Sequence, residues 1–388
     1  MKMLFAAVAV LTAVLAAGGE PRLETRFAGE RTVLLRDGAE FDFRSCLREQ
    51  LRRHPSMRAE DVLKLCFQGA GGPAHILGHI DAAEKHFHAE FSKVPARPDE
   101  PLYEPISPDF VRVNLGAWKA AGLPPEWLFR MFAASARKFG DADRVLARYL
   151  AIAEELLDGD RKRHFAAMRR NAVSTPHHSP AYRAAEAPSY RVVSSRFINA
   201  LPVLRKAAAL PERPLRIVAV DGRAASGKTT LARQLAQILR ADVVHMDDFF
   251  LPAKLRTRAR YDEPGGNVHY ERFMREVLPR LGDPKPFSYR VFDCSTMDYG
   301  GSAEIRSRRW RIVEGAYSLH PKFGDYADLK VFCDIAPEEQ MRRITSRNGE
   351  RGARMFRERW IPLEELYIRI CAPDRRADLV IGGDGRRK

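Results

Sequence analysis

The pattern of apolar and polar residues changes character near the middle of the chain. Short apolar runs rich in β-branched residues occur at residues 215–220, 243–246, 310–313, 329–335 and 379–381. Most of these runs alternate with stretches of helical periodicity. Because near-continuous apolar runs separated by helices are typical of parallel strands buried on both faces, we predict an α/β domain over residues 211–388. Its core would be a five-stranded parallel sheet with helices on both faces.

The first half of the chain has a different periodicity. Between about residues 43 and 157, apolar residues recur at helical spacing, for example at Trp127, Leu128 and Met131. We therefore predict a mainly α-helical domain of unknown role over residues 40–170, divided by a Pro-rich loop at residues 95–108.

Two further segments flank this helical domain. A hairpin is expected just before it, in residues 31–42, around Asp37 and Gly38. Residues 171–210 contain a stretch rich in Ser, Pro, His and Ala, which predicts an inter-domain linker.

Residues 1–19 form an apolar segment in which residues 3–19 carry no charge. It has the texture of a signal peptide, but several arginines follow it closely, and this asymmetry keeps the downstream side cytoplasmic. Three interpretations stay open: a cleaved signal, an anchor with the domains facing the cytoplasm, or codons upstream of the true start. We expect a cytoplasmic protein, with export less favoured, and membrane contact only if residues 3–19 are retained as an anchor.

The net charge of +15 changes this picture little, because it is spread along the chain. Residues 211–388 carry 34 Lys and Arg against 26 Asp and Glu, and residues 1–210 carry 31 against 24. An even surplus favours anionic small molecules over a dedicated nucleic-acid surface. We expect a small-molecule partner and no specific nucleic acid, and a homo-oligomer is compatible with the sequence. The five scattered cysteines form no C-x-x-C pair and predict reduced thiols.

Residues 222–229 (GRAASGKT) match the pattern of a phosphate-binding loop. The loop follows the apolar run at residues 215–220 and opens a helix with Leu231, Leu235 and Ile238 on one face. In this context backbone N–H groups surround phosphate, Lys228 reaches its oxygens, and the Thr229 hydroxyl completes a Mg²⁺ shell. We predict ATP and Mg²⁺ as cofactors. The ATP-binding residues of the loop would be Gly222, Arg223, Ala224, Ala225, Ser226, Gly227, Lys228, Thr229 and Thr230.

A pair of carboxylates follows the next apolar run, in residues 246–252 (MDDFFLP). A carboxylate at the carboxyl end of a parallel strand beside the loop could orient an acceptor hydroxyl and take its proton. Asp247 and Asp248 could equally be helix N-caps, which are common in α/β proteins.

Taken together, these motifs resemble the uridine kinase / phosphoribulokinase group of P-loop kinases over residues 213–382. The resemblance also rests on residues 261–267 (YDEPGGN), 287–293 (FSYRVFD), 312–315 (IVEG) and 337–349 (PEEQMRRITSRNG). It implies that Asp247 is the catalytic base and Lys228 a catalytic residue. Asp262 would hold the ribose hydroxyls, and Glu314 would join Thr229 at the magnesium unless it is an ordinary strand-end acid. The implied substrate-binding residues are Asp262, Phe250, Tyr289, Phe292 and Asp293.

Arg343, Arg347 and Arg351 are spaced four residues apart and would line one face of a helix. The resemblance implies a lid whose arginines close over the polyphosphate, with Arg343 and Arg347 catalytic and Arg351 binding ATP. A solvated basic helix face is the alternative, because further arginines lie nearby.

The expected function is ATP-dependent phosphorylation of a small-molecule hydroxyl, first of all the 5′-hydroxyl of uridine or cytidine. Phe250 and Phe292 replace the tyrosines usual in the family, which removes two hydrogen-bond donors and favours the same chemistry on another acceptor. Pantothenate, ribosylnicotinamide or a sugar phosphate are such alternatives. A different alternative is an ATP sensor that acts through the helical domain.

Two histidines in the helical region, His75 and His79, have the i, i+4 spacing of metal ligands. No third ligand is evident, and helical histidines in a basic protein are more often caps or surface residues. The region is loosely similar to an uncharacterised helical domain found ahead of such kinases.

Overall fold

The computed structural model describes residues 23–28, 31–36, 38–73, 79–135, 142–171, 177–293 and 295–382. The expectations for residues 1–19 and for His75 lie outside these residues. Within the described ranges, no helix is long and apolar enough to cross a membrane. Cys46, Cys66, Cys333 and Cys371 are free thiols, as expected.

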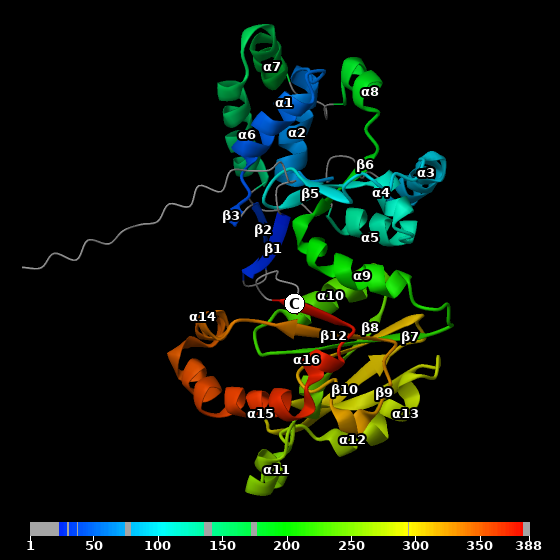
Figure 1. Ribbon diagram of the computed structural model, residues 1–388, viewed down its shortest axis with the longest axis vertical. Coiled ribbons are helices and arrows are strands. Elements are labelled where there is room, and N and C mark those ends of the chain that lie inside the picture. The colour runs from blue at the N-terminus through cyan, green and yellow to red at the C-terminus, as the bar shows by residue number, and fades with distance from the viewer. Residues whose placement is uncertain are drawn as a thin grey trace, which may run out of the picture.

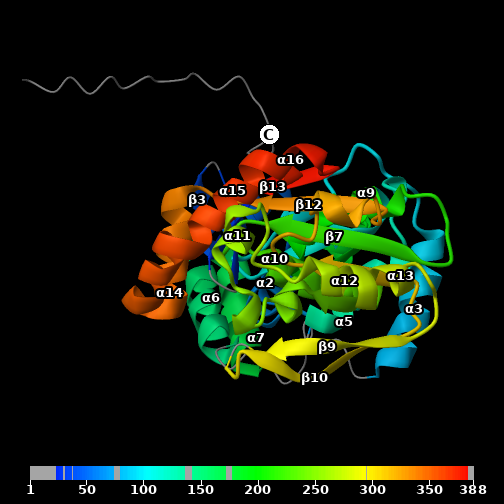
Figure 2. The ribbon, with the colours of Figure 1, turned by 90° about the horizontal axis from the view of Figure 1, so that it is seen from below.

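The C-terminal half contains the predicted five-stranded parallel sheet (Figures 1 and 2). Its strands are β7 (Arg216–Gly222), β8 (Asp242–His245), β11 (Trp310–Glu314), β12 (Leu329–Asp334) and β13 (Leu379–Gly382). Their order in the sheet is β13-β12-β7-β11-β8, and every neighbouring pair is parallel. The prediction of the sheet is confirmed, and each strand lies within two residues of its apolar run.

Successive residues of these strands face opposite sides of the sheet, as the two-residue period of a strand requires. Val218 and Ile312 join the core on the side of α10 (Lys228–Leu239), whereas Ile217 and Val313 join a second cluster on the other side. The other helices of this half are α11 (Arg258–Asp262), α12 (Tyr270–Glu276), α13 (Leu278–Leu281), α14 (Pro337–Met355), α15 (Ile361–Cys371) and α16 (Pro373–Arg376). An antiparallel hairpin of β9 (Phe287–Asp293) and β10 (Asp298–Ile305), which the sequence pattern did not predict, stands beside the sheet.

The N-terminal half is mainly helical, as predicted. Its helices are α1 (Phe43–Arg53), α2 (Ala59–Gly71), α3 (Ile80–Lys93), α4 (Leu115–Ala120), α5 (Pro125–Ser135), α6 (Ala142–Leu156), α7 (Gly159–Asn171) and α8 (Pro180–Glu186). The expected hairpin is confirmed by the pairing of β2 (Arg31–Arg36) with β3 (Ala39–Glu40), and β1 (Leu23–Ala28) extends it to three strands.

The prediction of a linker over residues 171–210 is wrong for the described residues 177–210. They form α8, the strand β6 (Tyr190–Ser194), the 3₁₀ helix η1 (Ser195–Ala200) and α9 (Leu201–Ala208). β6 pairs along its whole length with β5 (Phe110–Asn114), which also pairs with β4 (Tyr103–Pro105). Strands of three to five residues are too short for their alternation to stand out from a Pro- and Ser-rich background. The interpretation of residues 95–108 as a loop is corrected in the same way, because β4 lies within them.

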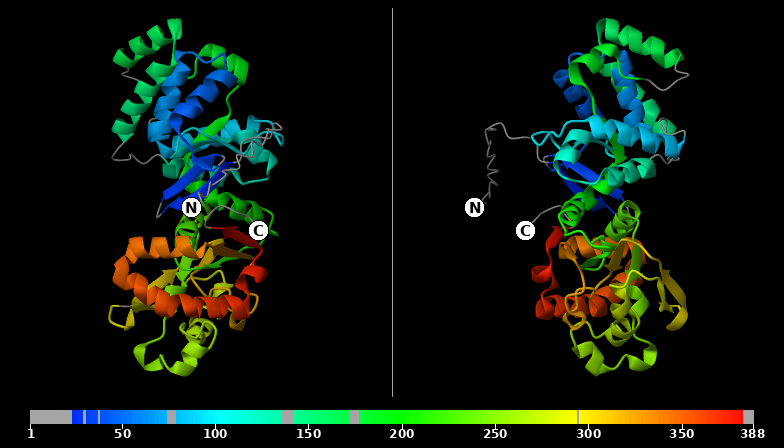
Figure 3. Two further views of the ribbon diagram at one scale, coloured as in Figure 1. Left: turned by 60° about the vertical axis from the view of Figure 1, so that its left-hand side comes forward. Right: turned by 90° about the vertical axis from the view of Figure 1, so that its right-hand side faces the viewer.

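The two halves are joined by packing (Figure 3). On the side facing the N-terminal half, α10 packs against α5 and η1. The rings of Trp127 and Trp310 lie edge to face with centroids 6.1 Å apart, and an Arg130 Nη1 donates to the Ile238 carbonyl oxygen at 2.7 Å. Buried residues of both halves therefore form one continuous apolar core.

A buried arginine fixes the loop that leads into β9. The Arg311 guanidinium is fully buried and donates to the carbonyl oxygens of Arg280, Leu281 and Lys285 at 2.9, 2.8 and 2.7 Å. Carbonyl groups in this position lose water on folding, and Arg311 gives each of them a donor; the Arg280 carbonyl also accepts from the Asp283 N–H at 3.1 Å.

We expect Arg311→Met to lower the free energy of unfolding by about 3 kcal/mol, because it removes the guanidinium donor from several buried or partly buried carbonyls. Urea unfolding followed by circular dichroism measures this loss. Arg309→Met is the matched control, since Arg309 forms an exposed ion pair with Glu212, worth about 0–1 kcal/mol. Equal stability of the two variants would contradict the assigned role of Arg311.

Candidate functional site

The loop between β7 and α10 has the backbone of a phosphate-binding loop. Gly222 has φ 147°, and a Cβ there would lie 2.2 Å from the Cys333 carbonyl oxygen, so this position requires glycine. Gly227 precedes α10 with φ 95°, and Ala225 also has a positive φ of 59°. The loop thereby turns back over the start of α10, where unpaired N–H groups and the helix dipole favour an anion.

Two buried acidic residues bind N–H groups of this loop. The sequence motifs did not single them out. Asp221 is fully buried and accepts hydrogen bonds from the N–H groups of Gly222, Tyr317 and Leu319 at 2.7, 3.0 and 2.9 Å. The Glu364 carboxylate on α15 accepts from the Ala224 N–H at 2.6 Å. Burial raises the pKa of both carboxyls, and Lys228 is among the groups that oppose this rise. Only the tertiary fold brings α15 to the loop, so neighbouring sequence carries no signal of it.

Thr229, Glu314 and His245 form a hydrogen-bonded chain at the carboxyl edge of the sheet. The Thr229 hydroxyl donates to Glu314 Oε1 at 2.8 Å, and His245 Nδ1 lies 2.9 Å from Glu314 Oε2. Burial alone would raise the pKa of Glu314, but the His245 hydrogen bond, Lys228 and Thr229 together hold it below its usual range. The same hydrogen bond raises the pKa of His245, against a smaller opposite effect of its burial. Glu314 is therefore an ionised carboxylate beside the phosphate-binding loop.

Asp247 and Asp248 follow β8 on the short 3₁₀ helix η2 (Met246–Phe249). The Asp247 side chain is exposed to solvent, yet the protein that surrounds its carboxyl raises the pKa of that group. Lys228 opposes this rise and the charge of Glu314 adds to it, which places Asp247 within electrostatic reach of the loop. Asp248 instead accepts a hydrogen bond from the Tyr289 hydroxyl at 2.8 Å. The two neighbouring acids thus have different surroundings, and only Asp248 is tied to the adjacent hairpin.

A cavity of about 410 Å³ adjoins the loop, between the start of α10 and α14. Lys228, Thr229 and Thr230 line one side, and Arg342, Arg343 and Arg347 line the other. Arg343 is buried, with Nε bonded to Glu339 at 2.7 Å and an Nη1 contact of 3.3 Å to the Ala225 carbonyl oxygen. The structure therefore brings Arg343 and Arg347 to the phosphate-binding loop, together with Arg342, which the sequence analysis did not include.

The expectation that Arg351 shares one helical face with these arginines is wrong. Gly349 has φ 66° and ψ 176°, a non-helical conformation that breaks α14 between Arg347 and Arg351. Arg351 is exposed beyond this break and does not line the cavity. A glycine in a run of arginines was the available signal for the break.

The residues predicted to bind the acceptor lie farther apart from one another than those around the phosphate-binding loop. Asp262 ends α11 with its side chain 72% exposed, so this carboxylate is not enclosed by a pocket. Figure 1 shows α11 at the end of the molecule farthest from the N-terminal half. Phe292 is buried in the hairpin against Tyr299, and Asp293 caps the turn at Ser295. Phe250 is half-buried.

The chain is similar in sequence to two kinases. No family model matches the chain. It is 24% identical over 145 residues to the cytidylate kinase of Pyrobaculum arsenaticum, which covers 37% of this chain and 66% of that protein, just under two thirds. It is 26% identical over 185 residues to the uridine kinase of Mycoplasma pneumoniae, covering 42% of this chain and 84% of that protein. The C-terminal half is a uridine kinase-like P-loop kinase segment.

The kinase segment is also similar to a solved structure of a possible uridine kinase from Bacillus stearothermophilus. That likeness has 20% identity and a TM-score of 0.39, and covers 47% of this chain and 97% of the other.

The oxygen atoms of Thr229 and Glu314 are suited to Mg²⁺, which prefers oxygen ligands and takes most of them from water and phosphate. In the part of the chain that the structure describes, no group of three or more His, Cys, Asp or Glu side chains could hold a metal by itself. His79 precedes α3 and lines a second cavity, in the N-terminal half.

The raised pKa of His245 makes a pH dependence of stability testable. A histidine whose pKa is higher in the folded than in the unfolded state stabilises fully below about pH 6.5, and this stabilisation is lost as the pH rises through the folded-state pKa. We expect the free energy of unfolding of the wild type, minus that of His245→Gln, to fall as the pH rises above about 6.5. Urea unfolding at several pH values measures it. Glu314→Gln should abolish this dependence on His245, and a difference independent of pH would refute the pairing.

Proposed function

We propose that the chain transfers the γ-phosphoryl group of ATP to a small-molecule hydroxyl, with the 5′-hydroxyl of uridine or cytidine as the first candidate acceptor. The observation that carries this proposal is the grouping of Lys228, Thr229, Glu314 and Asp247 around one loop. A loop that only senses ATP needs no carboxylate at the position where an acceptor hydroxyl would enter. Similarity to the cytidylate and uridine kinases supports the same class of reaction.

In this proposal, different residues bind the phosphates, the metal ion and the acceptor hydroxyl. N–H groups at the start of α10 and the Lys228 ammonium would bind the phosphates of ATP. Thr229 and Glu314 would hold Mg²⁺, which supplies neutralisation of phosphate charge when bound. Asp247 would orient the acceptor hydroxyl and take its proton as the new O–P bond forms and ADP leaves. A carboxyl with a raised pKa is a better proton acceptor than an ordinary aspartate once it is ionised.

Arginines of α14 would complete the phosphate side of the site. Arg343 is held by Glu339 and by the Ala225 carbonyl, so its guanidinium is positioned before any ligand binds. Arg347 lies on the same wall of the cavity. Positive groups fixed in place stabilise charge that develops on the transferred group without a cost of reorganisation.

The exposure of Asp262 favours a second candidate, the same reaction on another acceptor such as pantothenate, ribosylnicotinamide or a sugar phosphate. A ribose clamp works best as a carboxylate shielded from water, which this side chain is not. Phe292 also favours this second candidate, because its ring packs within the hairpin and is buried there.

We expect Asp247→Asn to lower kcat for phosphoryl transfer by about 10²–10⁴-fold while ATP binding is retained, because the amide removes the proton acceptor alone. Coupled ADP release measures turnover, and calorimetry measures ATP affinity. Asp325→Asn, at an exposed position of the same domain, is the control. Undiminished turnover in Asp247→Asn would remove this mechanism. Slow ATP hydrolysis that no acceptor stimulates, with salt-sensitive RNA or DNA binding, would favour the sensor instead.

An acceptor panel assayed by ADP release separates the two candidate acceptor classes. If uridine or cytidine is the acceptor and Asp262 holds its ribose, Asp262→Ala should raise KM for the nucleoside about tenfold or more and leave KM for ATP unchanged. Activity on uridine alone would dismiss the other acceptors. Activity on a non-nucleoside that is insensitive to Asp262→Ala would dismiss the nucleoside assignment.

A further inference from the structure

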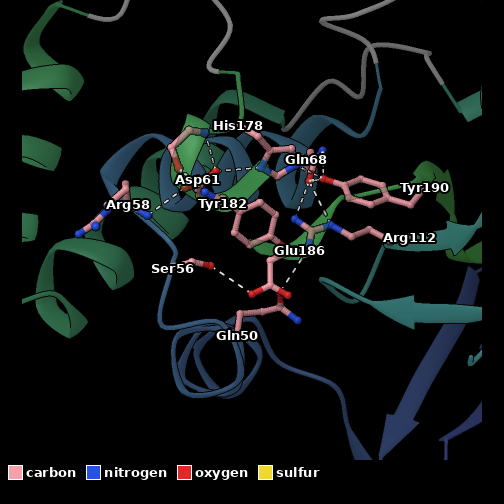
Figure 4. Close-up of polar contacts among 11 residues, drawn as sticks. Gln50, Ser56, Arg58, Asp61, Gln68, Arg112, His178, Tyr182, Glu186 and Tyr190 are labelled. Atoms are coloured by element: carbon pink, nitrogen blue, oxygen red, sulfur yellow. Dashed lines mark hydrogen bonds and ion pairs between the residues drawn. The ribbon is translucent and has the colours of Figure 1, made fainter. Parts of the chain in front are cut away.

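The N-terminal half contains a second cavity, of about 510 Å³, whose walls come from α2, α3 and the start of β6. Asp61, Lys64 and Gln68 are spaced three and four residues apart, so they share one face of α2. His178 and Tyr190, from the two ends of the segment that carries α8, meet this face. Figure 4 shows Asp61, His178, Tyr190 and Gln68 in contact with one another.

These side chains form a directed chain of hydrogen bonds. Asp61 accepts from the Ser179 N–H and hydroxyl at 2.9 and 2.6 Å, and its Oδ1 lies 2.9 Å from His178 Nδ1. Burial raises the pKa of Asp61, but hydrogen bonds from His178 and Ser179 outweigh this and hold it at about 2. An ionised carboxylate requires His178 Nδ1 to be the donor, and burial lowers the pKa of His178, which favours the neutral ring. His178 Nε2 is then an acceptor.

The chain continues to a phenol and a buried arginine. Tyr190 Oη lies 2.6 Å from His178 Nε2 and therefore donates to it, while it accepts from Gln68 Nε2 at 3.2 Å. Gln68 Oε1 in turn accepts from Arg112 Nη2 at 2.9 Å. Every donor and acceptor from Arg112 to Asp61 can thus be assigned consistently. Three of these residues, Gln68, His178 and Tyr190, line the cavity.

Positive charge in the wall of this cavity, and behind it at Arg112, is incompletely neutralised. The buried Arg112 guanidinium hydrogen-bonds only to the neutral amides of Gln50 and Gln68 among the described residues. Lys64, half-buried in the cavity wall, has no hydrogen bond or ion pair within the described ranges. Its pKa is lowered to about 8, first by burial and then by Arg112 and Arg183, and the charge of Asp61 only partly opposes this fall. By contrast, Arg191, which also lines the cavity, forms an ion pair with Glu90 at 2.6 Å.

We propose that this cavity is a second ligand site, separate from the phosphate-binding loop, for a small molecule that carries an oxyanion. The Lys64 ammonium pairs with the phosphate or carboxylate of the ligand, and the Tyr190–His178 pair forms the adjoining wall of the site. A purely structural network would explain the buried hydrogen bonds. It would not explain a cavity of ligand size lined by a half-buried ammonium that has no hydrogen bond or ion pair among the described residues, because burying such a charge is costly.

Protection of Lys64 from acylation tests the proposal in the full-length protein. An amine-reactive acylating reagent is applied near pH 8, and mass spectrometry of peptides measures modification at each lysine. The probes are inorganic phosphate, ribose 5-phosphate and malonate, each up to about 10 mM, which detects Kd values in the millimolar range. We expect at least one probe to slow Lys64 modification several-fold and to leave the exposed Lys85, on α3, unaffected.

The probes also distinguish the two sources of an oxyanion. Protection by phosphate and ribose 5-phosphate alone assigns a phosphate ligand, and protection by malonate alone assigns a carboxylate ligand. The same protection is expected in Lys228→Ala, whose defect lies in the other domain. Failure of all three probes, or loss of protection in Lys228→Ala, would overturn the proposal.

Calorimetry with the protecting probe in the Lys228→Ala background provides a second test. Lys64→Met should weaken binding about tenfold or more, because it removes a charged partner of the anion, and Lys85→Met should not. Melting curves show whether each variant is folded. If Lys64→Met does not fold, the protection experiment on the unmutated lysine still decides. Unchanged affinity in a folded Lys64→Met variant would refute the site.

Discussion

The buried carboxylate of Asp221 is the constraint on which the kinase site depends. It accepts from the N–H groups of Gly222, Tyr317 and Leu319 and from the Tyr367 hydroxyl at 2.7 Å, so one side chain joins the start of the phosphate-binding loop, the segment after β11, and α15. Taking a carboxylate out of water is costly, and burial indeed raises its pKa. The hydrogen bonds that offset this cost exist only when all three segments are in place. The geometry of the loop is therefore a property of the assembled domain.

A second connection joins the loop to the helix that carries the arginines. Gln340, near the start of α14, donates to Glu364 at 2.8 Å and contacts the Ala224 carbonyl oxygen at 3.1 Å, while Glu364 binds the Ala224 N–H. These hydrogen bonds hold the first part of α14, which carries Arg343, against the phosphate-binding loop. The break at Gly349 separates this fastened part from the exposed part that carries Arg351. Arg343 is therefore held at the phosphate-binding loop and Arg351 is not, although the arginines are equally spaced in the sequence.

The sequence allowed prediction of those features that depend on short stretches of chain. The five apolar runs became five parallel strands, and the glycines and Lys228 of the loop specified its turn, because both signals are local. The roles of Asp221 and Glu364 depend on segments more than 90 residues away, so no local pattern revealed them. β6 was missed for a related reason: its partner β5 lies about 80 residues earlier, and composition alone suggested a linker. Asp262 matched a motif, yet its exposure is set by where α11 ends and by what packs around it.

The pairing of β6 with β5 also explains why the two halves are held in a defined relation. The chain leaves this small sheet directly into η1 and α9, and both pack on the kinase segment, η1 against α10 and α9 against β12. α10 begins at the phosphate-binding loop, and apolar side chains such as Leu231 and Leu235 are fully buried in the core that both halves share. Each such side chain stabilises its packing by about 1.5–3 kcal/mol, so α10 cannot shift alone without losing several of these contributions. α10 packs against η1, and η1 contacts β6, so packed elements run without a gap from the phosphate-binding loop to the strand that carries Tyr190.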